Sequence, residues 1–426
     1  MFRLSFFSKV ASGMIALAAA SVHAAPPLTL QEALRQAASR SKLLIAQEAS
    51  VASVRQRALA AGQLPDPVLK LGVDNLPVNG ADRFSLTRDF MTMRRIGVMQ
   101  ELTSADKRSL RTAVLTQEAA KQQAQRQIAL AQLQRDTASA WLELYYGLQL
   151  RELLVRQQQE IRLQVEAAES AYRTGKGNQA DVFAARSAVF SLDDRISQAD
   201  RQIRGARLAL TRWTGALPDQ SLAGEVPWRT SELQGALAYG HLRDHPQVVM
   251  LNAQVLAAEA DVRLAEAAKT ADWTVEASYA QRGPAFSNMV SIGISIPLQL
   301  DQTNRQDREL AAKLALATEA RARFDDMVSA HETEISSLIN DWQSGKERVD
   351  RYTAQLLPVA AQRSQAALTT WRTGKSDLAT VLAARRDELD MRIQALTVEM
   401  ETARAWAQLN FLIPEETLAV QQKETP

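Results

Sequence analysis

Two long stretches of the chain have the composition and hydrophobic spacing of very long helices. The stretches at about 104–213 and 302–412 are rich in the strong helix formers Ala, Leu, Gln, Arg and Glu. In the second, Leu382, Leu389 and Leu396 recur at the seven-residue spacing of a coiled-coil seam. A helix of about 70 residues is about 100 Å long at 1.5 Å per residue. We therefore expect two helical hairpins that are longer than a globular domain uses.

Between the helical stretches the pattern changes to alternation of apolar residues with polar or small ones. A period of two is that of a β-strand with one apolar face. Alternation alone also fits a half-buried sheet in a soluble protein. The four predicted strands cover about 67–75, 94–102, 273–282 and 289–299.

Both hairpins turn at nearly the same sequence. Residues 172–186 read YRTGKGNQADVFAAR and residues 371–385 read WRTGKSDLATVLAAR, with nine of fifteen positions identical. Gly175 and Gly374 can adopt the left-handed conformation that ends a helix. The Gly-Lys pair is not a phosphate loop, because the glycine four residues before it and the preceding strand are missing. The stretch instead predicts a tight turn between antiparallel helices.

The repeated turn is part of a tandem duplication. Each half has a short helix, a second helix that ends near Gly62 or Lys269, two strands and a long hairpin. Pro358 predicts a kink in the second hairpin, whereas the first has Gln159 at the matching place. The predicted units are a signal peptide at 1–25, repeats at 26–230 and 231–414, and a tail at 415–426.

The N-terminus has the order of a secretory signal peptide. Arg3 and Lys9 precede an apolar run at 10–20, and small residues allow cleavage after Ala24 or Ala25. No later apolar run approaches the roughly 20 residues of a membrane-spanning helix. The predicted export favours a membrane barrel over a soluble sheet for the four strands. The very long helices favour it too, because they offer the strands no core to cover. Four strands cannot close a barrel with a pore, so several chains would have to share it.

Composition and motifs exclude most chemistry. The chain has no cysteine, which excludes disulfides, thiolate catalysis and a lipidated cysteine, and its net charge of +2 implies no nucleic-acid partner. His241 and His245 are four residues apart, but Pro246 favours a turn there, and His331 lacks the second histidine of a zinc motif. We expect no catalytic, cofactor-binding or metal-binding residues, no cofactor and no enzyme activity.

The order of helix, two strands and long hairpin, present twice, resembles the TolC-type outer-membrane efflux family. The match covers about 28–414 and is strongest at LLPVAAQRSQAALTTWRTGKSDLATVLAAR, residues 356–385. The stretch FMTMRRIGVMQELTSADKR, residues 90–108, resembles the branch that serves heavy-metal resistance pumps.

The resemblance implies a fold and a function. The fold would be mainly helical with a membrane β-barrel portion, in which a homotrimer forms one twelve-stranded barrel in the outer-membrane lipid above a periplasmic helical tunnel. The function would be a passive exit duct, for heavy-metal cations in that branch. Its partners would be a periplasmic adaptor protein and an inner-membrane resistance-nodulation-division transporter. Hairpins also occur in periplasmic adaptor or coiled-coil scaffold proteins, which remain the alternative.

The resemblance also implies roles for the turns. Some relatives close the tunnel with aspartate rings, at positions that here correspond to Thr380 and Ala383. The acidic and amide residues Asn178, Asp181 and Asp377 are therefore the candidate periplasmic gate. Many relatives of the metal branch carry an acylated cysteine, which this chain lacks. The candidate adaptor-docking tips, with exposed basic and hydroxyl groups, are Arg173, Thr174, Gly175, Lys176, Arg372, Thr373, Gly374 and Lys375.

Overall fold

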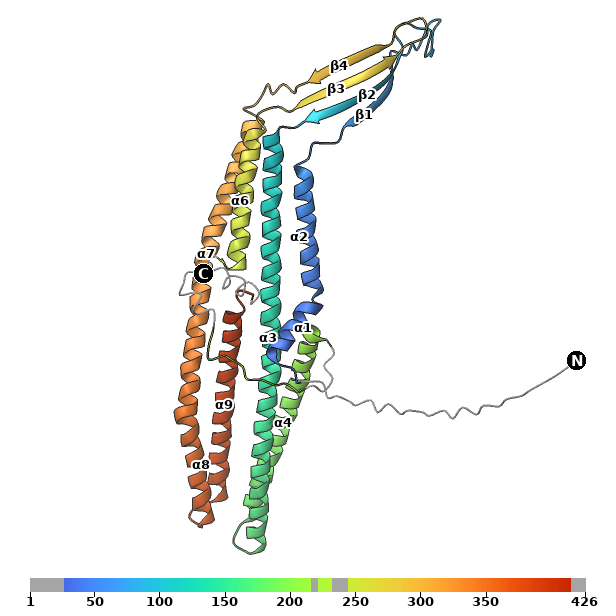
Figure 1. The fold of residues 1–426 in the computed structure, drawn as a ribbon. Coiled ribbons are helices and arrows are strands. Elements are labelled where there is room, and N and C mark those ends of the chain that lie inside the picture. The colour runs from blue at the N-terminus through green and yellow to red at the C-terminus, as the bar shows by residue number, and fades with distance from the viewer. Residues whose placement is uncertain (1–26, 216–220, 232–243, 415–426) are drawn as a thin grey trace, which may run out of the picture.

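The computed structural model describes residues 27–215, 221–231 and 244–414. The predicted signal peptide, His241 and the predicted tail lie outside the described residues. The molecule is elongated, with a β-sheet at one end and two helical turns at the other (Figure 1). The expected mainly helical class with four antiparallel strands is confirmed.

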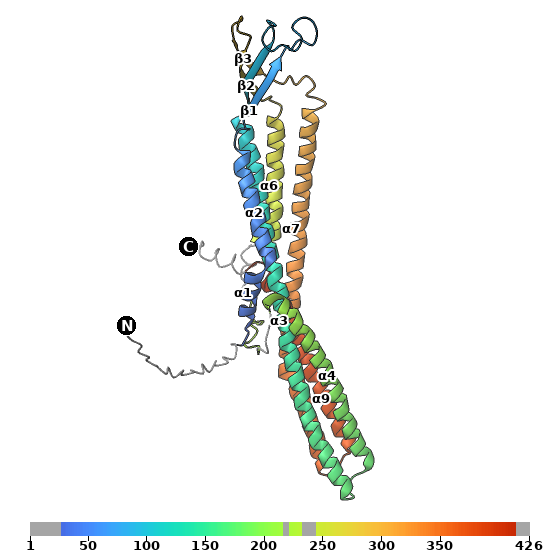
Figure 2. The ribbon, with the colours of Figure 1, turned by 90° about the vertical axis from the view of Figure 1, so that its right-hand side faces the viewer.

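The first hairpin consists of two uninterrupted helices. Helix α3 (Ala105–Arg173) contains 69 residues, which corresponds to about 100 Å at 1.5 Å per residue. It passes Gln159 without a break and runs from the sheet to the lower turn (Figures 1 and 2). Helix α4 (Gln179–Thr214) returns beside its lower half.

The second hairpin is interrupted near Pro358. Helix α7 (Gln306–Arg351) leads into a π-helical turn (Tyr352–Leu356), and α8 (Leu357–Arg372) follows directly. The N–H of Leu357 donates to the carbonyl of Tyr352, five residues earlier. Pro358 cannot donate and its ring crowds the preceding turn, and the wider π turn accommodates it without ending the helix. The expected kink is therefore a π turn just before the proline.

Shorter helices complete the upper half of the molecule. Helices α1 (Leu30–Arg40) and α2 (Lys42–Ala61) are separated by Ser41, whose extended backbone ends one helix and whose hydroxyl accepts from the N–H of Leu44. Helix α6 (Pro246–Ala267) lies between α3 and α7 (Figure 2).

The four strands form one antiparallel sheet in the order β1-β2-β3-β4. Strands β1 and β4 are its edges, so each has one side without a strand partner in the described chain. Strand β4 ends before the predicted residue 299, because Pro297 has no N–H to continue a ladder. The strands are β1 (Val68–Asp74), β2 (Met93–Leu102), β3 (Trp273–Gln281) and β4 (Met289–Ser295).

The largest core cluster lies at mid-height, where three tryptophans hold non-helical segments against the helices. The indole N–H of Trp141 donates to the carbonyl of Leu28 at 3.2 Å, that of Trp342 to Trp228 at 2.6 Å, and that of Trp406 to Thr230 at 2.8 Å. Buried indoles need such acceptors.

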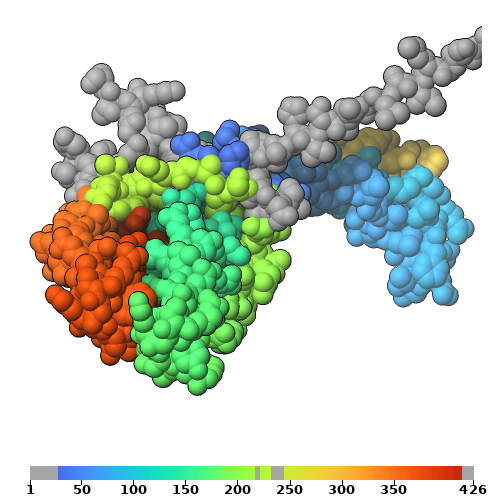
Figure 3. All heavy atoms as spheres, turned by 90° about the horizontal axis from the view of Figure 1, so that it is seen from below, coloured from blue at the N-terminus to red at the C-terminus, as the bar shows by residue number. Residues whose placement is uncertain are grey.

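Below this level the two hairpins lie side by side. From below, α3 and α4 form one half of the body and α8 and α9 (Leu378–Asn410) the other (Figure 3). Leu389 of the predicted seam is 2% exposed and packs with Leu154 and Leu192 of the first hairpin. The seam therefore joins the hairpins to each other.

Candidate functional site

The two hairpin tips share one backbone motif. Gly175 has φ of +72° and Gly374 has φ of +74°. The N–H of Lys176 donates to the carbonyl of Ala171 at 2.9 Å, and the N–H of Lys375 donates to that of Thr370 at 3.0 Å. This bond, six residues to one, defines a Schellman helix end. A left-handed residue is required in it, which explains why glycine recurs at both tips.

The basic side chains of the tips are exposed, whereas the threonine hydroxyls are engaged locally. Within the described ranges, Arg173, Lys176, Arg372 and Lys375 have no ion-pair partner. The hydroxyl of Thr174 donates to the carbonyls of Ser170 and Ala171, and Thr373 bonds its own helix in the same way. The tips therefore present four unpaired cations per chain, and the expected free hydroxyl donors are used to complete the helix ends.

Two of the three candidate gate residues cap helices. The side chain of Asn178 accepts from the N–H of Asp181 at 2.8 Å, and Asp377 accepts from the N–H of Thr380 at 2.8 Å. The bonds from Thr380 lower the pKa of the Asp377 carboxyl. Asp181 lies in the first turn of α4, where a carboxylate interacts favourably with the helix dipole. Its carboxylate has no ion-pair partner in the described chain, so it is the least constrained acid at the tips.

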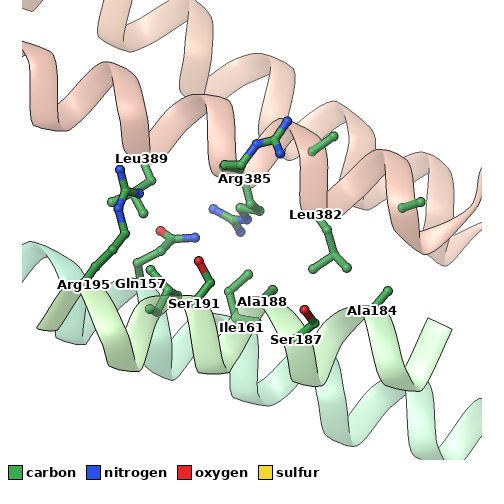
Figure 4. Close-up of a pocket in the computed structure, with 14 residues that line it drawn as sticks. Gln157, Ile161, Ala184, Ser187, Ala188, Ser191, Arg195, Leu382, Arg385 and Leu389 are labelled. Atoms are coloured by element: carbon green, nitrogen blue, oxygen red, sulfur yellow. The ribbon is translucent and has the colours of Figure 1, made fainter. Parts of the chain in front are cut away.

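A groove of about 400 Å³ separates the hairpins above the tips. Ala383 of α9 lines it. Gln157 of α3 and Ser187 of α4 line it as well (Figure 4). Two arginines reach across it. Arg195 of α4 pairs with Asp390 of α9 at 3.0 Å, and Arg385 of α9 pairs with Glu160 of α3 at 3.0 Å. These ion pairs join the two hairpins directly.

A buried carboxylate lies beside the groove. The side chain of Glu388 is 5% exposed and pairs with Arg385 at 3.2 Å and Arg392 at 2.7 Å, all on α9. Sequence reasoning did not single out these residues. The spacing of Arg385, Glu388 and Arg392, three and four residues apart, is a signal for pairing on one helix face, but it does not reveal that the face is buried.

The sheet has an exposed apolar face. One row across all four strands consists of Leu71, Ile96, Tyr279 and Val290, which are paired in register. The large apolar side chains on this face are between 43% and 77% exposed. They are Leu69, Leu71, Val73, Ile96, Val98, Tyr279, Val290, Ile292 and Ile294.

The opposite face is polar. Lys70 on β1 pairs with Glu276 on β3, and Arg95 on β2 pairs with Asp74 on β1. Arg95 also lies 4.0 Å from Glu276. The sheet therefore separates an apolar surface from a charged one.

Two histidines meet at mid-height. His245 caps α6 through Nδ1, and its ring centroid is 4.3 Å from that of His331 on α7. Burial, followed by the neighbouring His331 and Arg135, lowers the pKa of His245 to about 4. Within 27–215, 221–231 and 244–414, no group of three His, Cys, Asp or Glu residues is placed to hold a metal ion.

None of the helices in the described chain combines the length and the apolar character needed to cross a membrane.

Comparisons with known proteins find a relative and solved structures of similar fold. No model of a known protein family matches the chain. Over 396 residues it is 26% identical to the cobalt-zinc-cadmium resistance protein CzcC of Cupriavidus metallidurans, which covers 90% of this chain and 89% of that protein.

Two solved structures share the fold. CusC, whose crystal structures concern folding and transmembrane channel formation, matches with a TM-score of 0.75, 14% identity and coverage of 90% of this chain and 91% of that chain. The open state of the Neisseria gonorrhoeae MtrE outer membrane channel matches with a TM-score of 0.74, 15% identity and coverage of 90% and 88%. The described chain thus has nearly the full length of these proteins and their architecture.

Proposed function

We propose, from the premise that this chain has the fold of the TolC-type outer-membrane efflux channels, that it is the outer-membrane channel of an efflux system. It would be a passive exit duct and not an enzyme. Substrate would be delivered by an inner-membrane resistance-nodulation-division transporter through a periplasmic adaptor protein, and would leave along a tunnel of helices and a barrel of strands.

The observation that carries this proposal is the sheet. It has one exposed apolar face, one charged face and two free edges. A strand edge in a membrane must be paired, because hydrocarbon offers no hydrogen bonds. Four strands are too few to enclose a pore. Three copies joined from β4 to β1 would give twelve strands, with the apolar face toward outer-membrane lipid and the charged face toward water.

Fractionation tests the channel role most directly. The full chain should be recovered in outer membranes as a trimer that resists detergent and dissociates on heating. Recovery as a soluble periplasmic monomer would refute the duct and would favour an adaptor or scaffold protein.

The tips are the proposed adaptor-docking surface. In a trimer, six exposed turns with unpaired arginine and lysine side chains would surround one tunnel mouth, and such a surface favours an acidic partner. Lys176→Glu combined with Lys375→Glu should leave the trimer intact and abolish efflux. Arg57→Glu, an exposed reversal on α2, is the matched control and should transport normally. Normal efflux by the tip variant would refute docking there.

The same end of the molecule carries the proposed gate. Asn178, Asp181 and Asp377 stand at the first turns of α4 and α9, where carboxylates of three chains would meet. Asp181→Asn together with Asp377→Asn preserves both helix caps and removes the charge, so single-channel conductance in planar bilayers should rise. An unchanged conductance would remove these residues as a gate.

Heavy-metal cations are the proposed cargo, supported by the relative named for cobalt, zinc and cadmium resistance. Deletion of the gene should increase sensitivity to those three metals more than to dyes or antibiotics. The opposite order of sensitivities would assign the duct to organic compounds.

A further inference from the structure

The segment that joins β4 to α7 extends the apolar alternation of β4 beyond the sheet. Every second residue from Val290 to Leu300 is apolar. Past the end of the strand, Ile296 is 46% exposed, Leu298 79% and Leu300 90%. Leu298 and Leu300 are thus among the most exposed large apolar side chains of the described chain.

Two glutamines fix the orientation of this segment. The side-chain N–H₂ of Gln299 donates to the carbonyl of Ala268 at 3.0 Å, and that of Gln302 donates to the carbonyl of Lys269 at 3.3 Å. Both carbonyls lie at the C-terminal end of α6. Successive side chains of an extended chain point to opposite sides. With Gln299 turned toward α6, Leu298 is directed away from the protein. Leu300 begins the following turn, and its 90% exposure shows that it too faces outward.

The depth of these leucines can be estimated from strand geometry. Leu298 is eight residues from Val290, or about 26 Å along an extended chain at about 3.3 Å per residue. With a strand tilt of about 40°, Leu298 lies about 20 Å below Val290 along the membrane normal. This separation fits within the apolar band of about 25 Å that membrane barrels present. Leu300 falls at the edge of that band. Trp273, 53% exposed at the start of β3, lies at the same end, where membrane proteins place aromatic residues.

We propose that Leu298 and Leu300 insert into the periplasmic leaflet of the outer membrane and anchor the junction between barrel and tunnel to phospholipid. This inference rests on the proposed membrane channel. The turn at 300–305 and the first residues of α7 carry three charges without ion-pair partners in the described chain, Asp301, Arg305 and Arg308. Asp307 is paired with Lys269, and Glu309 with Lys313. The resulting single positive charge is compatible with anionic headgroups.

Lipid accounts for the exposure of Leu298 and Leu300 better than a neighbouring copy of the chain does. A neighbouring strand pairs with the backbone edge of β4, in the plane of the sheet. Leu298 and Leu300 continue the face of the sheet, which edge pairing leaves open. The ladder also stops at Pro297, which has no N–H to donate.

Spin labelling tests the proposal on the full chain. Because the chain contains no cysteine, Leu298→Cys, Ile292→Cys and Leu316→Cys each give one label. The labelled trimers are placed in vesicles of phosphatidylethanolamine and phosphatidylglycerol. Accessibility is then measured to oxygen, which concentrates in lipid, and to a water-soluble nickel chelate. Leu316, a 50% exposed leucine on α7, is the matched control away from the membrane.

The labels at positions 298 and 292 should both show high oxygen and low nickel accessibility, differing several-fold from the label at position 316. Two results would overturn the anchor. High accessibility of the label at position 298 to the nickel chelate would place the segment in water. Low accessibility of that label to both oxygen and the nickel chelate would place the segment against a second copy of the chain. If the label at position 292 also lacks high oxygen and low nickel accessibility, the proposed membrane barrel is refuted. The label at 292 thus distinguishes failure of the anchor from failure of the proposed channel.

Discussion

A buried helix crossing gives the sharpest prediction about stability. Gly345 of α7 faces Thr402 of α9, and a Cβ added at Gly345 would lie 3.0 Å from Cγ2 and 3.1 Å from Cβ of Thr402, and closer still to Oγ1. Thr402 is 2% exposed and its hydroxyl donates to the carbonyl of Val398 at 2.7 Å. Rotating the side chain would break that bond and would leave Cβ in place, so the two helices must move apart.

Gly345→Ala should therefore destabilise the protein even though alanine favours helices. Overpacking costs about 1–3 kcal/mol, and the gain in helix propensity is about 1 kcal/mol. The net loss should be at most about 2 kcal/mol, which lowers the melting temperature of the purified protein by a few °C. Far-ultraviolet circular dichroism in detergent measures it.

Two further variants separate the clash from other effects. Gly205 of α4 has no atom within 4 Å of an added Cβ, so Gly205→Ala should raise the melting temperature slightly. Thr402→Ala removes two of the three clashing atoms, and adding it to Gly345→Ala should recover part of the lost stability. If Gly345→Ala raises the melting temperature as Gly205→Ala does, the close approach of α7 and α9 is refuted.

Three other predictions concern buried or capping side chains. Burial lowers the pKa of His245 from 6.5 to about 4, so the unfolded chain binds the proton more readily, and stability should fall by up to about 3 kcal/mol as pH drops from 6.5 to 4. His245→Asn, which keeps a capping side chain, should flatten that part of the curve in thermal melts. Asp377→Ala should increase hydrogen exchange in the first turn of α9, whereas Asp377→Asn, which still caps Thr380, should not. Glu388→Ala should cost about 3 kcal/mol in the same melts because it leaves Arg385 poorly compensated in a buried site, and a loss under 1 kcal/mol would mean that water reaches the pair.

Features set by neighbouring residues could be predicted from the sequence. Hydrophobic period, glycine and capping residues are local signals, so both tips, with Gly175 and Gly374 in the left-handed conformation, could be placed before the structure was known. The resemblance to the TolC-type efflux family, drawn from the repeated order of elements, is confirmed by the shared fold and by the 26% identical relative.

Features that depend on which surfaces meet could not be predicted. The pair of Lys70 and Glu276 joins residues 206 positions apart, and it follows from the strand register. The burial of Glu388 depends on which face of α9 packs against α3. His245 and His331 come into contact only because α6 and α7 run side by side. Near Pro358 the sequence predicted a kink, but it did not indicate that the irregularity would take the form of a π turn at Tyr352–Leu356.

The π turn makes the two hairpins mechanically unequal. In α3 the ladder of backbone bonds is unbroken over 69 residues, so a sideways load on its tip meets uniform bending stiffness up to the sheet. In the second hairpin the ladder changes period at Tyr352–Leu356 and loses a donor at Pro358, so the same load concentrates bending there. In the proposed trimer of six tips, stiff and compliant contacts would alternate, and the proposed adaptor would displace every second tip while the others hold their position.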